Sequence, residues 1–519
     1  MEETSFGVIA LLPVILTIGL AIKTKNVVLA LTIGVFTGVM IQVGGNPVTA
    51  TTTMVGDYLI EQLKDGYNAG IIVLLLFIGG FVTLIECSGG AESFARKVAG
   101  LVNNRAKLQI SAWVGGIAVF FSELGTPLIV GPIFRPLFDK LRVSREKLAW
   151  IIDSTASPVC VLIPFIGWGV YSMGLIQKEF DALGITEVTD WTAFIQAIPF
   201  QFYPILCLLI VPLVAVSGRE FSYMAKAEEN AKKGIFSSLD PDAAPARNMI
   251  TNTNVSPLVV VVPLIVLFVT LFAILAPLGF PVKQVPGSKF RIALISGYFY
   301  GALTMIVLMA YYKVKPLMEG IKTYIRGFHK MLECILILIL AWSLGAVGKA
   351  IGTPDFIVMM ARETVPYWSV PAIIFFIGAL ISFATGTSWG TFAIMMPIAI
   401  PMAIHLDAPL YVSIAAVLSG GLFGDHCSPI SDTTILASTG ADCSLIDHIK
   451  TQLPYALLCA GVSVAGYLIA GYFASTIVTA LCIIAMVIVF IIASKLRGTK
   501  VENLSIKEVE ALAAESKDA

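Results

Sequence analysis

The stretch that decides the fold is Gly424-Asp425-His426-Cys427-Ser428-Pro429-Ile430-Ser431-Asp432-Thr433-Thr434, where two carboxylates, four hydroxyls and a proline interrupt a long apolar segment. Residues 411–421 before it are nearly all apolar, and residues 435–440 after it carry no charge. An ionised aspartate in hydrocarbon costs about 3 kcal/mol or more, so it persists only where it lines a cavity or has a partner. A helix broken at Pro429 frees carbonyl groups that bind a cation and amide groups that bind an anion. The stretch therefore predicts a broken membrane helix on an ion pathway.

Composition places the whole chain in a membrane. Hydrophobic residues make up 57% of the 519 residues and charged residues 13%, and the mean hydropathy is +0.88, far from the values of a soluble protein. Apolar runs such as 71–85, 255–278 and 457–492 exceed what a soluble core needs. We therefore expect a polytopic membrane protein. The start Met1-Glu2-Glu3 lacks a positively charged region, which predicts that no signal peptide is cleaved.

Several function classes are disfavoured by what the sequence contains. A net charge of zero argues against nucleic acid binding. The eight cysteines include no CxxC pair, so we expect neither structural disulfides nor a zinc site. The chain has no GxxxxGK[ST] motif and no filter-like ring motif, which disfavours ATP-driven transport and a channel. We expect no enzymatic activity and no cofactor other than a coupling ion.

Hydropathy predicts an all-α protein with about eleven full crossings, and two further apolar stretches that Gly, Pro and polar residues interrupt. The crossings fall near 7–22, 26–43, 70–87, 148–175, 196–216, 255–278, 291–312, 331–348, 410–439, 454–472 and 475–494. If the interrupted stretches, 108–134 and 369–403, are re-entrant hairpins, most Lys and Arg residues fall on one side of the membrane. The positive-inside rule makes that side cytoplasmic, which predicts an outside N-terminus and a cytoplasmic C-terminus.

The two halves of the chain resemble each other on either side of the polar stretch 217–254. Four short motifs recur in the same order, among them Gly125-Thr126-Pro127 with Gly386-Thr387-Ser388. Each half has five crossings and one hairpin. Because an odd number of crossings carries the chain to the other side of the membrane, the second half starts from the opposite side and is inverted. Inverted-topology repeats with broken helices are typical of secondary transporters. The expected domains are a first repeat (1–216, with hairpin 108–134 and broken helix 148–175), a cytoplasmic linker (217–254), an inverted second repeat (255–472, with hairpin 369–403 and broken helix 410–439), and an extra helix with a cytoplasmic tail (473–519).

The repeat predicts that four polar elements converge: the hairpin tips 122–127 and 385–391, and the breaks at 153–158 and 425–434. Four acids there have no counterpart in the other half, so the scaffold does not require them: Glu123, Asp153, Asp425 and Asp432. Burial favours the neutral form of a carboxylate and a bound cation favours the charged form, so one site can hold either a proton or Na⁺. These acids are the candidate coupling groups. His426 joins them because it could titrate near neutral pH, although a structural role is equally consistent with its position.

Hydroxyls and freed carbonyls are the hard oxygen ligands that an alkali cation prefers, although Ser and Thr also cap buried helix ends. Arg135 could bind a substrate carboxylate or extend to the inner surface. Trp168 and Trp389 could wall an organic substrate or simply pack, and Glu86 and Glu333 are equally ambiguous. The candidate sodium- or substrate-binding residues are Thr126, Ser154, Thr155, Ser157, Thr385, Thr387, Ser388, Ser428, Ser431, Thr433 and Arg135.

The run Phe423–Ser438, with Gly386-Thr-Ser-Trp-Gly-Thr391 upstream, resembles the NhaC family of sodium/proton antiporters. The resemblance implies Na⁺-linked secondary transport in a cytoplasmic membrane. By analogy with related families that have paired hairpins, it also implies a homodimer in which a mobile domain moves against a scaffold as an elevator. Other relatives exchange organic acids coupled to these ions, so the resemblance leaves the substrate open.

We therefore expect a Na⁺/H⁺ antiporter in which Asp425, Ser428, Ser431 and Asp432 hold Na⁺ and protons compete for the same carboxylates. Glu123 or Asp153 would supply an additional titrating group. The alternative is a Na⁺- or H⁺-coupled carrier of a small organic carboxylate or amino acid. A non-transporting membrane scaffold or receptor is a remote third possibility, because only a pathway explains so many intramembrane acids.

Overall fold

A computed structural model of the chain describes residues 6–90, 93, 102–238, 255–280, 285–353, 356, 359, 365–501, 503 and 508. In this part of the chain ten helices are long and apolar enough to cross a membrane, or twelve if each of two bent helix pairs is counted as one span. The chain is a multi-pass, almost entirely helical membrane protein, as predicted.

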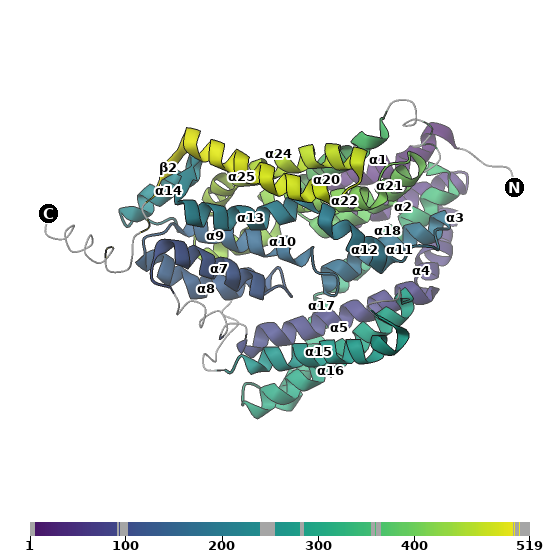
Figure 1. The fold of residues 1–519 in the computed structure, drawn as a ribbon. Helices are drawn as coiled ribbons and strands as arrows, with labels where there is room; N and C mark the ends of the chain where they lie inside the picture. Colours follow the sequence, from purple (N-terminus) through teal and green to yellow (C-terminus); the bar gives the residue numbers. More distant parts are fainter. Residues whose placement is uncertain are drawn as a thin grey trace.

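The first half consists of a short 3₁₀-helix, η1, followed by a series of helices of uneven length (Figure 1). They are η1 (Gly7–Leu11), α1 (Leu12–Thr24), α2 (Val27–Gln42), α3 (Pro47–Thr53), the π-helical η2 (Met54–Leu59), α4 (Ile60–Lys64), α5 (Gly66–Ser88), α7 (Arg105–Ala118), α8 (Gly125–Lys140), α9 (Arg145–Thr155), α10 (Ser157–Cys160), α11 (Gly167–Leu183), α12 (Asp190–Ala197), η3 (Ile198–Phe200) and α13 (Phe202–Ser217).

The second half follows a strand, β1 (Arg219–Phe221), which pairs antiparallel with β2 (Gly498–Lys500) near the other end of the chain. Its helices are α14 (Ser222–Lys232), α15 (Leu258–Leu275), η4 (Ala276–Leu278), α16 (Gly287–Tyr311), α17 (Leu317–His329), α18 (Leu332–Ala350), η5 (Tyr367–Ser369), α20 (Val370–Thr385), α21 (Ser388–His405), α22 (Leu410–Cys427), α23 (Asp432–Ala441), α24 (Leu445–Phe473) and α25 (Ile477–Arg497).

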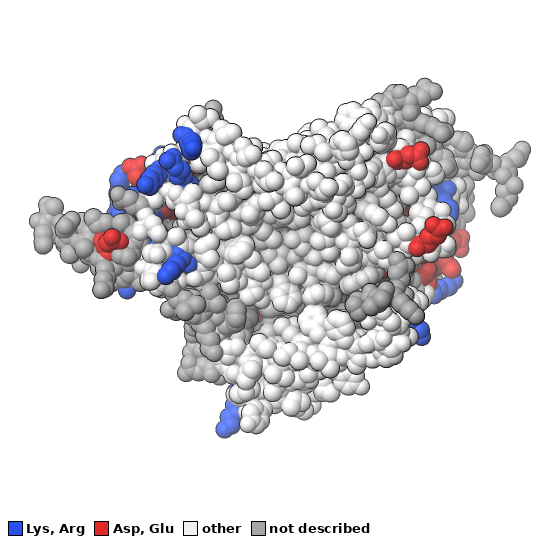
Figure 2. Space-filling view, in the orientation of Figure 1, with Lys and Arg blue, Asp and Glu red and all other residues white. Residues whose placement is uncertain are grey.

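The long helices α5, α15, α24 and α25 run in roughly one direction across the molecule (Figure 1). Figure 2 shows charged side chains gathered at the two ends of this direction, with an uncharged surface between them. Lys and Arg predominate at the end that carries α14 and β2. Because charged side chains avoid hydrocarbon, the uncharged surface is the part that faces lipid.

Each predicted hairpin or broken helix contains an interruption of helical structure. The first hairpin is α7 and α8, separated by residues 119–124, and the second is α20 and α21, separated by Gly386 and Thr387. The predicted crossing 410–439 is α22 and α23, separated by residues 428–431, and the crossing 148–175 is divided among α9, α10 and α11. The inverted relation between the halves, which these matching interruptions suggest, stays a prediction.

Glycine allows the second hairpin to meet the second broken helix. Gly386 ends α20 with φ +71°, a conformation that side chains disfavour, and a Cβ there would lie 2.8 Å from the Ile430 carbonyl oxygen. Along the same pair of elements, a Cβ at Gly420 would lie 2.4 Å from the Phe375 carbonyl oxygen. Helices α20 and α22 therefore touch backbone to backbone, and their two breaks lie side by side.

The structure adds helices where the sequence analysis expected loops. The segment after α2 forms α3, η2 and α4, bent by 115° from α2, and the expected linker begins with β1 and α14. Helix α17 precedes the predicted crossing 331–348 and, together with α18, passes as one 34-residue candidate span, Leu317–Ala350. Linker residues 239–254 and the tail beyond 508 lie outside the described residues.

A polar cavity at the helix breaks

A cavity of about 420 Å³ lies where interruptions of several helices meet. Its wall includes both predicted hairpin tips and the break between α22 and α23. It also includes two interruptions outside the predicted hairpins and broken helices, at residues 25–26 and 330–331. The polar and charged residues of its wall are Lys25, Asn26, Glu86, Ser122, Glu123, Lys330, Glu333, Thr385, Thr387, Asp425, Ser431, Asp432 and Thr433.

Helix ends of both polarities face this cavity. Helices α20 and α22 end at its wall, so the carbonyl end of each helix lies there, although the Phe383 carbonyl accepts from Ser428 Oγ and the His426 carbonyl from Gln452 Nε2. Helices α2, α8, α11, α18, α21 and α23 begin at its wall or one residue beyond it, so free amide groups are also present. The ends of broken helices can therefore contribute partial negative charge for a cation and partial positive charge for an anion.

Asp425, at the C-terminal end of α22, and Glu86 of α5 are the most enclosed acids of the cavity wall, each with 5% of its surface exposed. The Oδ2 atom of Asp425 accepts a hydrogen bond of 2.8 Å from Ser388 Oγ, at the start of α21. Its Oδ1 atom is buried and has no hydrogen-bond partner among the described residues. Removing a carboxylate from water without a partner is costly, so this oxygen requires a proton or a cation.

The neighbouring hydroxyls differ in what they can offer. Ser431 Oγ and Thr433 Oγ1 lie 3.0 Å apart at the start of α23, and both residues line the cavity. Asp432 lies between them and is open to the cavity. Ser428 Oγ instead donates to the Phe383 carbonyl at 2.8 Å, and Ser428 does not line the cavity. Of the predicted sodium ligands, the structure therefore brings Asp425, Ser431 and Asp432 to the cavity, and places Ser428 in the joint between α20 and α22.

The opposite wall carries an ion pair that the sequence analysis missed. Lys330, just after α17, pairs with Glu86 of α5, whose Oε1 atom also accepts a 2.8 Å hydrogen bond from Ser122 Oγ. Glu123 lines the cavity next to this group, beside Trp168 and Trp389. Lys330 lies between the predicted crossings 291–312 and 331–348. The signal that could have revealed it is the polar run Arg326–Lys330 directly before an apolar helix that begins with an acid, Glu333.

Asp153 lies behind the cavity wall, in a separate buried cluster. Its Oδ2 atom accepts a 2.7 Å hydrogen bond from Gln452 Nε2, and it lies 3.4 Å from His448 Nε2 and 3.6 Å from His426 Nε2. Tyr203 Oη lies 2.7 Å from His426 Nδ1. His448 and Gln452 are not among the predicted site residues, because they precede the apolar run of α24. Their spacing of four residues, which places both on one helix face, was the available signal.

The remaining predicted residues lie away from the cavity. Thr126 and Thr155 each donate to the backbone carbonyl four residues earlier, as hydroxyls within helical turns do. Ser154 and Ser157 are buried, and their hydroxyls have no hydrogen-bond partner among the described residues. Arg135 forms an ion pair of 3.1 Å with Asp442 and does not line the cavity. Its placement fits the second of its two predicted roles better than the binding of a substrate in this cavity.

Comparison with known proteins agrees with this architecture. The model of the Na⁺/H⁺ antiporter family matches residues 4–165 and 159–472. An uncharacterized Haemophilus influenzae protein is 31% identical over 469 residues, which cover 88% of this chain and 89% of that protein. A malate-2H⁺/Na⁺-lactate antiporter of Bacillus subtilis is 34% identical over 171 residues, 31% of this chain and 34% of that one. The crystal structure of the Alcanivorax borkumensis YdaH transporter has a similar fold, with a TM-score of 0.56 and 16% identity over 82% of this chain and 88% of that one. The chain belongs to the Na⁺/H⁺ antiporter family, a family of membrane transporters.

Proposed function

We propose that this antiporter exchanges Na⁺ for H⁺ at Asp425. The observation that carries the proposal is the unpartnered Oδ1 atom of this buried carboxylate, which faces a cavity ringed by broken helices. Sodium would bind Asp425 together with carbonyl groups at the ends of α20 and α22. Ser431, Asp432 and Thr433 line the same cavity and would complete the oxygen shell.

Competition between the two cations at one carboxylate is sufficient for exchange. When Na⁺ occupies the site, Asp425 is charged, and when Na⁺ leaves, the buried carboxylate is stabilised by a proton. With either Na⁺ or a proton bound, Asp425 carries no net charge, so the loaded site can move across the membrane. The empty site, with its charged carboxylate, cannot. Glu123 in the cavity wall and Asp153 in the cluster behind it are the further groups that could take up a proton.

A second candidate is the exchange of a small organic acid coupled to the same ions. The cavity volume of about 420 Å³ is far larger than one hydrated cation requires. Lys25 and several helix N-termini at the wall could bind a carboxylate group. The partial similarity to a malate-2H⁺/Na⁺-lactate antiporter supports the same candidate.

We further propose the cytoplasmic membrane as the location, with the N-terminus outside and the C-terminus in the cytoplasm. The Lys- and Arg-rich end that carries α14 and β2 supports this orientation. A homodimer with an elevator motion follows only by analogy with transporters that have paired hairpins.

The test is Na⁺-driven pH change in proteoliposomes of the full-length protein, first without and then with a panel of carboxylates and amino acids. Wild-type protein should change the internal pH with Na⁺ alone, and Asp425→Asn should abolish the change. Asp57→Asn, which alters an exposed acid in η2, serves as the matched control and should retain it. A response only after one organic solute is added would replace the first candidate with the second. An Asp425→Asn variant with wild-type exchange would remove Asp425 from the site.

A further inference from the structure

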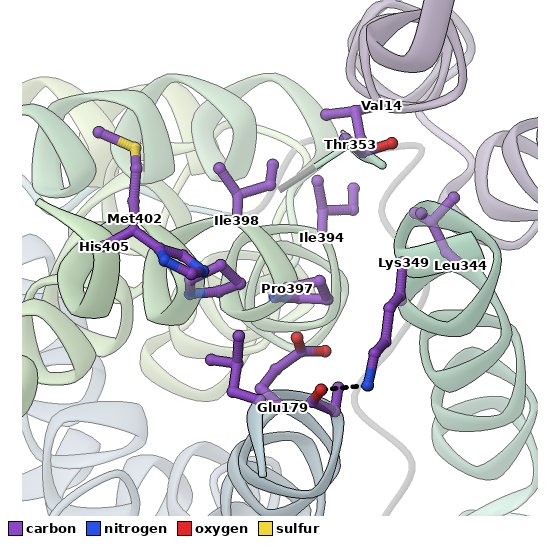
Figure 3. Close-up of a pocket in the computed structure, with 15 residues that line it drawn as sticks. Val14, Glu179, Leu344, Lys349, Thr353, Ile394, Pro397, Ile398, Met402 and His405 are labelled. Atoms are coloured by element: carbon purple, nitrogen blue, oxygen red, sulfur yellow. Dashed lines mark hydrogen bonds between the residues drawn. The ribbon is translucent and has the colours of Figure 1, made fainter. Parts of the chain in front are cut away.

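Buried polar atoms without a hydrogen-bond partner gather behind the central cavity. A second cavity, of about 270 Å³ between α11, α18 and α21, contains none of them among its described residues, and its wall pairs a carboxylate with two basic side chains: Glu179, Lys349 and His405 (Figure 3). The unpartnered atoms of the group behind the central cavity are Asp153 Oδ1, Gln452 Oε1, His426 Nε2 and both ring nitrogens of His448. A folded protein leaves few such atoms, so their concentration in one place points to a function.

Gln452, near the start of α24, joins the broken ends of two other helices. It is 1% exposed, and its side-chain amide group has two hydrogens to donate. Nε2 donates 2.7 Å to Asp153 Oδ2, near the end of α9, and also donates to the His426 carbonyl in the last turn of α22. Helix α9 belongs to the first half of the chain and α22 to the second. One amide group therefore connects an interruption of each half.

The residue that Gln452 holds is the direct neighbour of Asp425. The ring of His426 is held as well, because His426 Nδ1 lies 2.7 Å from Tyr203 Oη of α13. None of these three groups lines the central cavity, whereas Asp425 does, and there it accepts the hydrogen bond from Ser388 Oγ. A helix that is interrupted inside a membrane has no following turn to fix its last residues. The bonds to His426 therefore hold the end of α22 from behind while its carboxylate is presented to the cavity.

The chemistry of Gln452 indicates a role beyond packing. Its Oε1 atom is buried without a described partner, which costs free energy that an apolar side chain of the same length would not cost. What the amide group offers in return is two donors for two acceptors. A hydroxyl would supply only one donor, and a lysine would add a positive charge beside Asp153.

We propose that Gln452 is a positioning residue for cation binding at Asp425. By holding the His426 carbonyl, it fixes the end of α22 so that Asp425 stays within reach of Ser388 and of a cation in the central cavity. The bond from the same amide group to Asp153 ties that buried carboxylate to the end of α22, so a change at Asp153 reaches Asp425 through Gln452. The inference rests on the Na⁺/H⁺ exchange at Asp425 proposed above.

The test is Gln452→Met, which keeps the length of the side chain and removes both donors. Calorimetric titration of the full-length protein with NaCl in phosphatidylcholine nanodiscs, at constant ionic strength, measures Na⁺ affinity without transport. The variant should bind Na⁺ about tenfold more weakly than wild type. The matched control is Gln109→Met, because Gln109 is 6% exposed and donates to the Arg105 carbonyl of its own helix, α7. It should leave Na⁺ affinity unchanged, even if both variants lower the midpoint of thermal unfolding.

A second measurement reports the position of the end of α22 without any cation. Cys427 directly follows His426 and is 5% exposed, so its rate of alkylation by N-ethylmaleimide, located by peptide mass spectrometry, measures how often this end leaves its place. Gln452→Met should speed the alkylation of Cys427, and Gln109→Met should not.

The outcomes separate this proposal from the exchange on which it rests. Equal Na⁺ affinity in wild type and Gln452→Met, or equal alkylation of Cys427, would overturn the role of Gln452 alone. Absence of Na⁺ binding to wild type would overturn the exchange at Asp425 and the role of Gln452 together. Weaker Na⁺ binding with faster alkylation, seen in Gln452→Met and not in Gln109→Met, would establish the positioning role.

Discussion

Three intramembrane aspartates that look alike in the sequence occupy three different environments. Asp425 is enclosed at the cavity wall and has one hydrogen-bond donor. Asp432 is open to the same cavity at the start of α23. Asp153 is 1% exposed and lies among two histidines and a glutamine. A cation that enters the cavity can therefore reach the first two directly, whereas Asp153 can respond only through its neighbours.

Ser388→Ala should weaken sodium binding at Asp425. The hydroxyl donates to the carboxylate at 2.8 Å, and a hydrogen bond to a charged group contributes about 1.5–3 kcal/mol. Its loss favours the protonated form, so a proton should compete better and half-maximal exchange should require about tenfold more Na⁺. Na⁺ titration of exchange in proteoliposomes measures this. Ser413→Ala on α22, the helix that carries Asp425, is the control, because its buried hydroxyl has no described partner. Equal curves for both variants would contradict the role of Ser388.

The acids of the site could be predicted from the sequence, but their partners could not. An acid in an apolar run is visible at once, since hydrocarbon does not tolerate it without a reason. Partners such as Lys330 and His448 lie in polar segments next to apolar runs, where a charge needs no explanation. Only the three-dimensional approach of distant segments, here Lys330 to Glu86 across 244 positions, gives these residues a role.

At the scale of the elements, the site depends on where helices stop. Asn26, Thr387 and Asn104 each accept a hydrogen bond from an amide of the helix that follows, so the new helix begins at a fixed residue. Gly386 ends α20 in the left-handed conformation. These local choices direct two helix ends toward the same cavity without any strand or loop domain to hold them.

Gly420→Ala should destabilise the contact between α20 and α22. A Cβ at this position would lie 2.4 Å from the Phe375 carbonyl oxygen, and backbone cannot yield as a flexible side chain can. Overpacking of this kind costs about 1–3 kcal/mol. We expect a lower midpoint of thermal unfolding in detergent.

Gly461→Ala on α24 is the matched control, because nothing lies within 4 Å of a Cβ there. It should leave the midpoint unchanged or raise it, since alanine favours a helix more than glycine does. Equal midpoints for the Gly420→Ala variant and wild type would mean that α20 and α22 do not approach as closely as described.

The long elements and their interruptions were predictable, and the short ones were not. Sustained hydropathy predicted the crossings, and Gly and Pro within apolar runs such as 369–403 and 410–439 predicted the interruptions. Helices such as α3, α12 and α17 are short or amphipathic, and their sequences fit a loop equally well. Their structure comes from packing against other helices, as in the contact of Gly327 on α17 with the backbone of Gly79.

At the scale of the whole molecule, a buried ion cluster attaches the start of the linker to the helical body. Glu228 of α14 pairs with Arg105 of α7 and accepts hydrogen bonds of 2.9 and 2.8 Å from the Ser144 amide and hydroxyl. Lys147 of α9 pairs with Glu220 of β1, which also accepts a 2.6 Å hydrogen bond from Tyr455 of α24. Four helices and the strand thus share one cluster at the Lys- and Arg-rich end.

Glu228→Gln should destabilise the protein at neutral pH and reduce its sensitivity to acid. Burial alone would raise the pKa of Glu228, but Lys147 and Arg105 outweigh burial and hold that pKa below its usual value. Because the pKa is lowered in the folded state, the charge of Glu228 contributes fully to the free energy of unfolding above the unfolded-state pKa of about 4.3. This contribution is lost as the pH falls through the folded-state pKa. Removing one partner of a buried ion pair lowers the free energy of unfolding by about 3–5 kcal/mol.

Thermal unfolding midpoints between pH 3 and pH 8 measure both effects. Wild type should lose stability steeply on the acid side, and Glu228→Gln should start lower at pH 7 and decline less. The adjacent Glu229→Gln is the control, because that exposed acid pairs only with Lys233 across one turn and should leave the curve unchanged. Parallel curves for wild type and Glu228→Gln would show that the charge of Glu228 does not support the fold.

The pairing of β1 with β2 makes residues 221 to 498 a closed unit whose two ends are neighbours. Phe221 lies opposite Gly498, and Arg219 also donates to the Ser494 carbonyl. The entropy lost on closing a loop rises only with the logarithm of its length, so a three-residue ladder supported by the ion cluster can join segments this far apart. Units with adjacent ends can be duplicated, transplanted or reordered without rerouting the remaining chain. The small sheet therefore brings the two ends of residues 221–498 together.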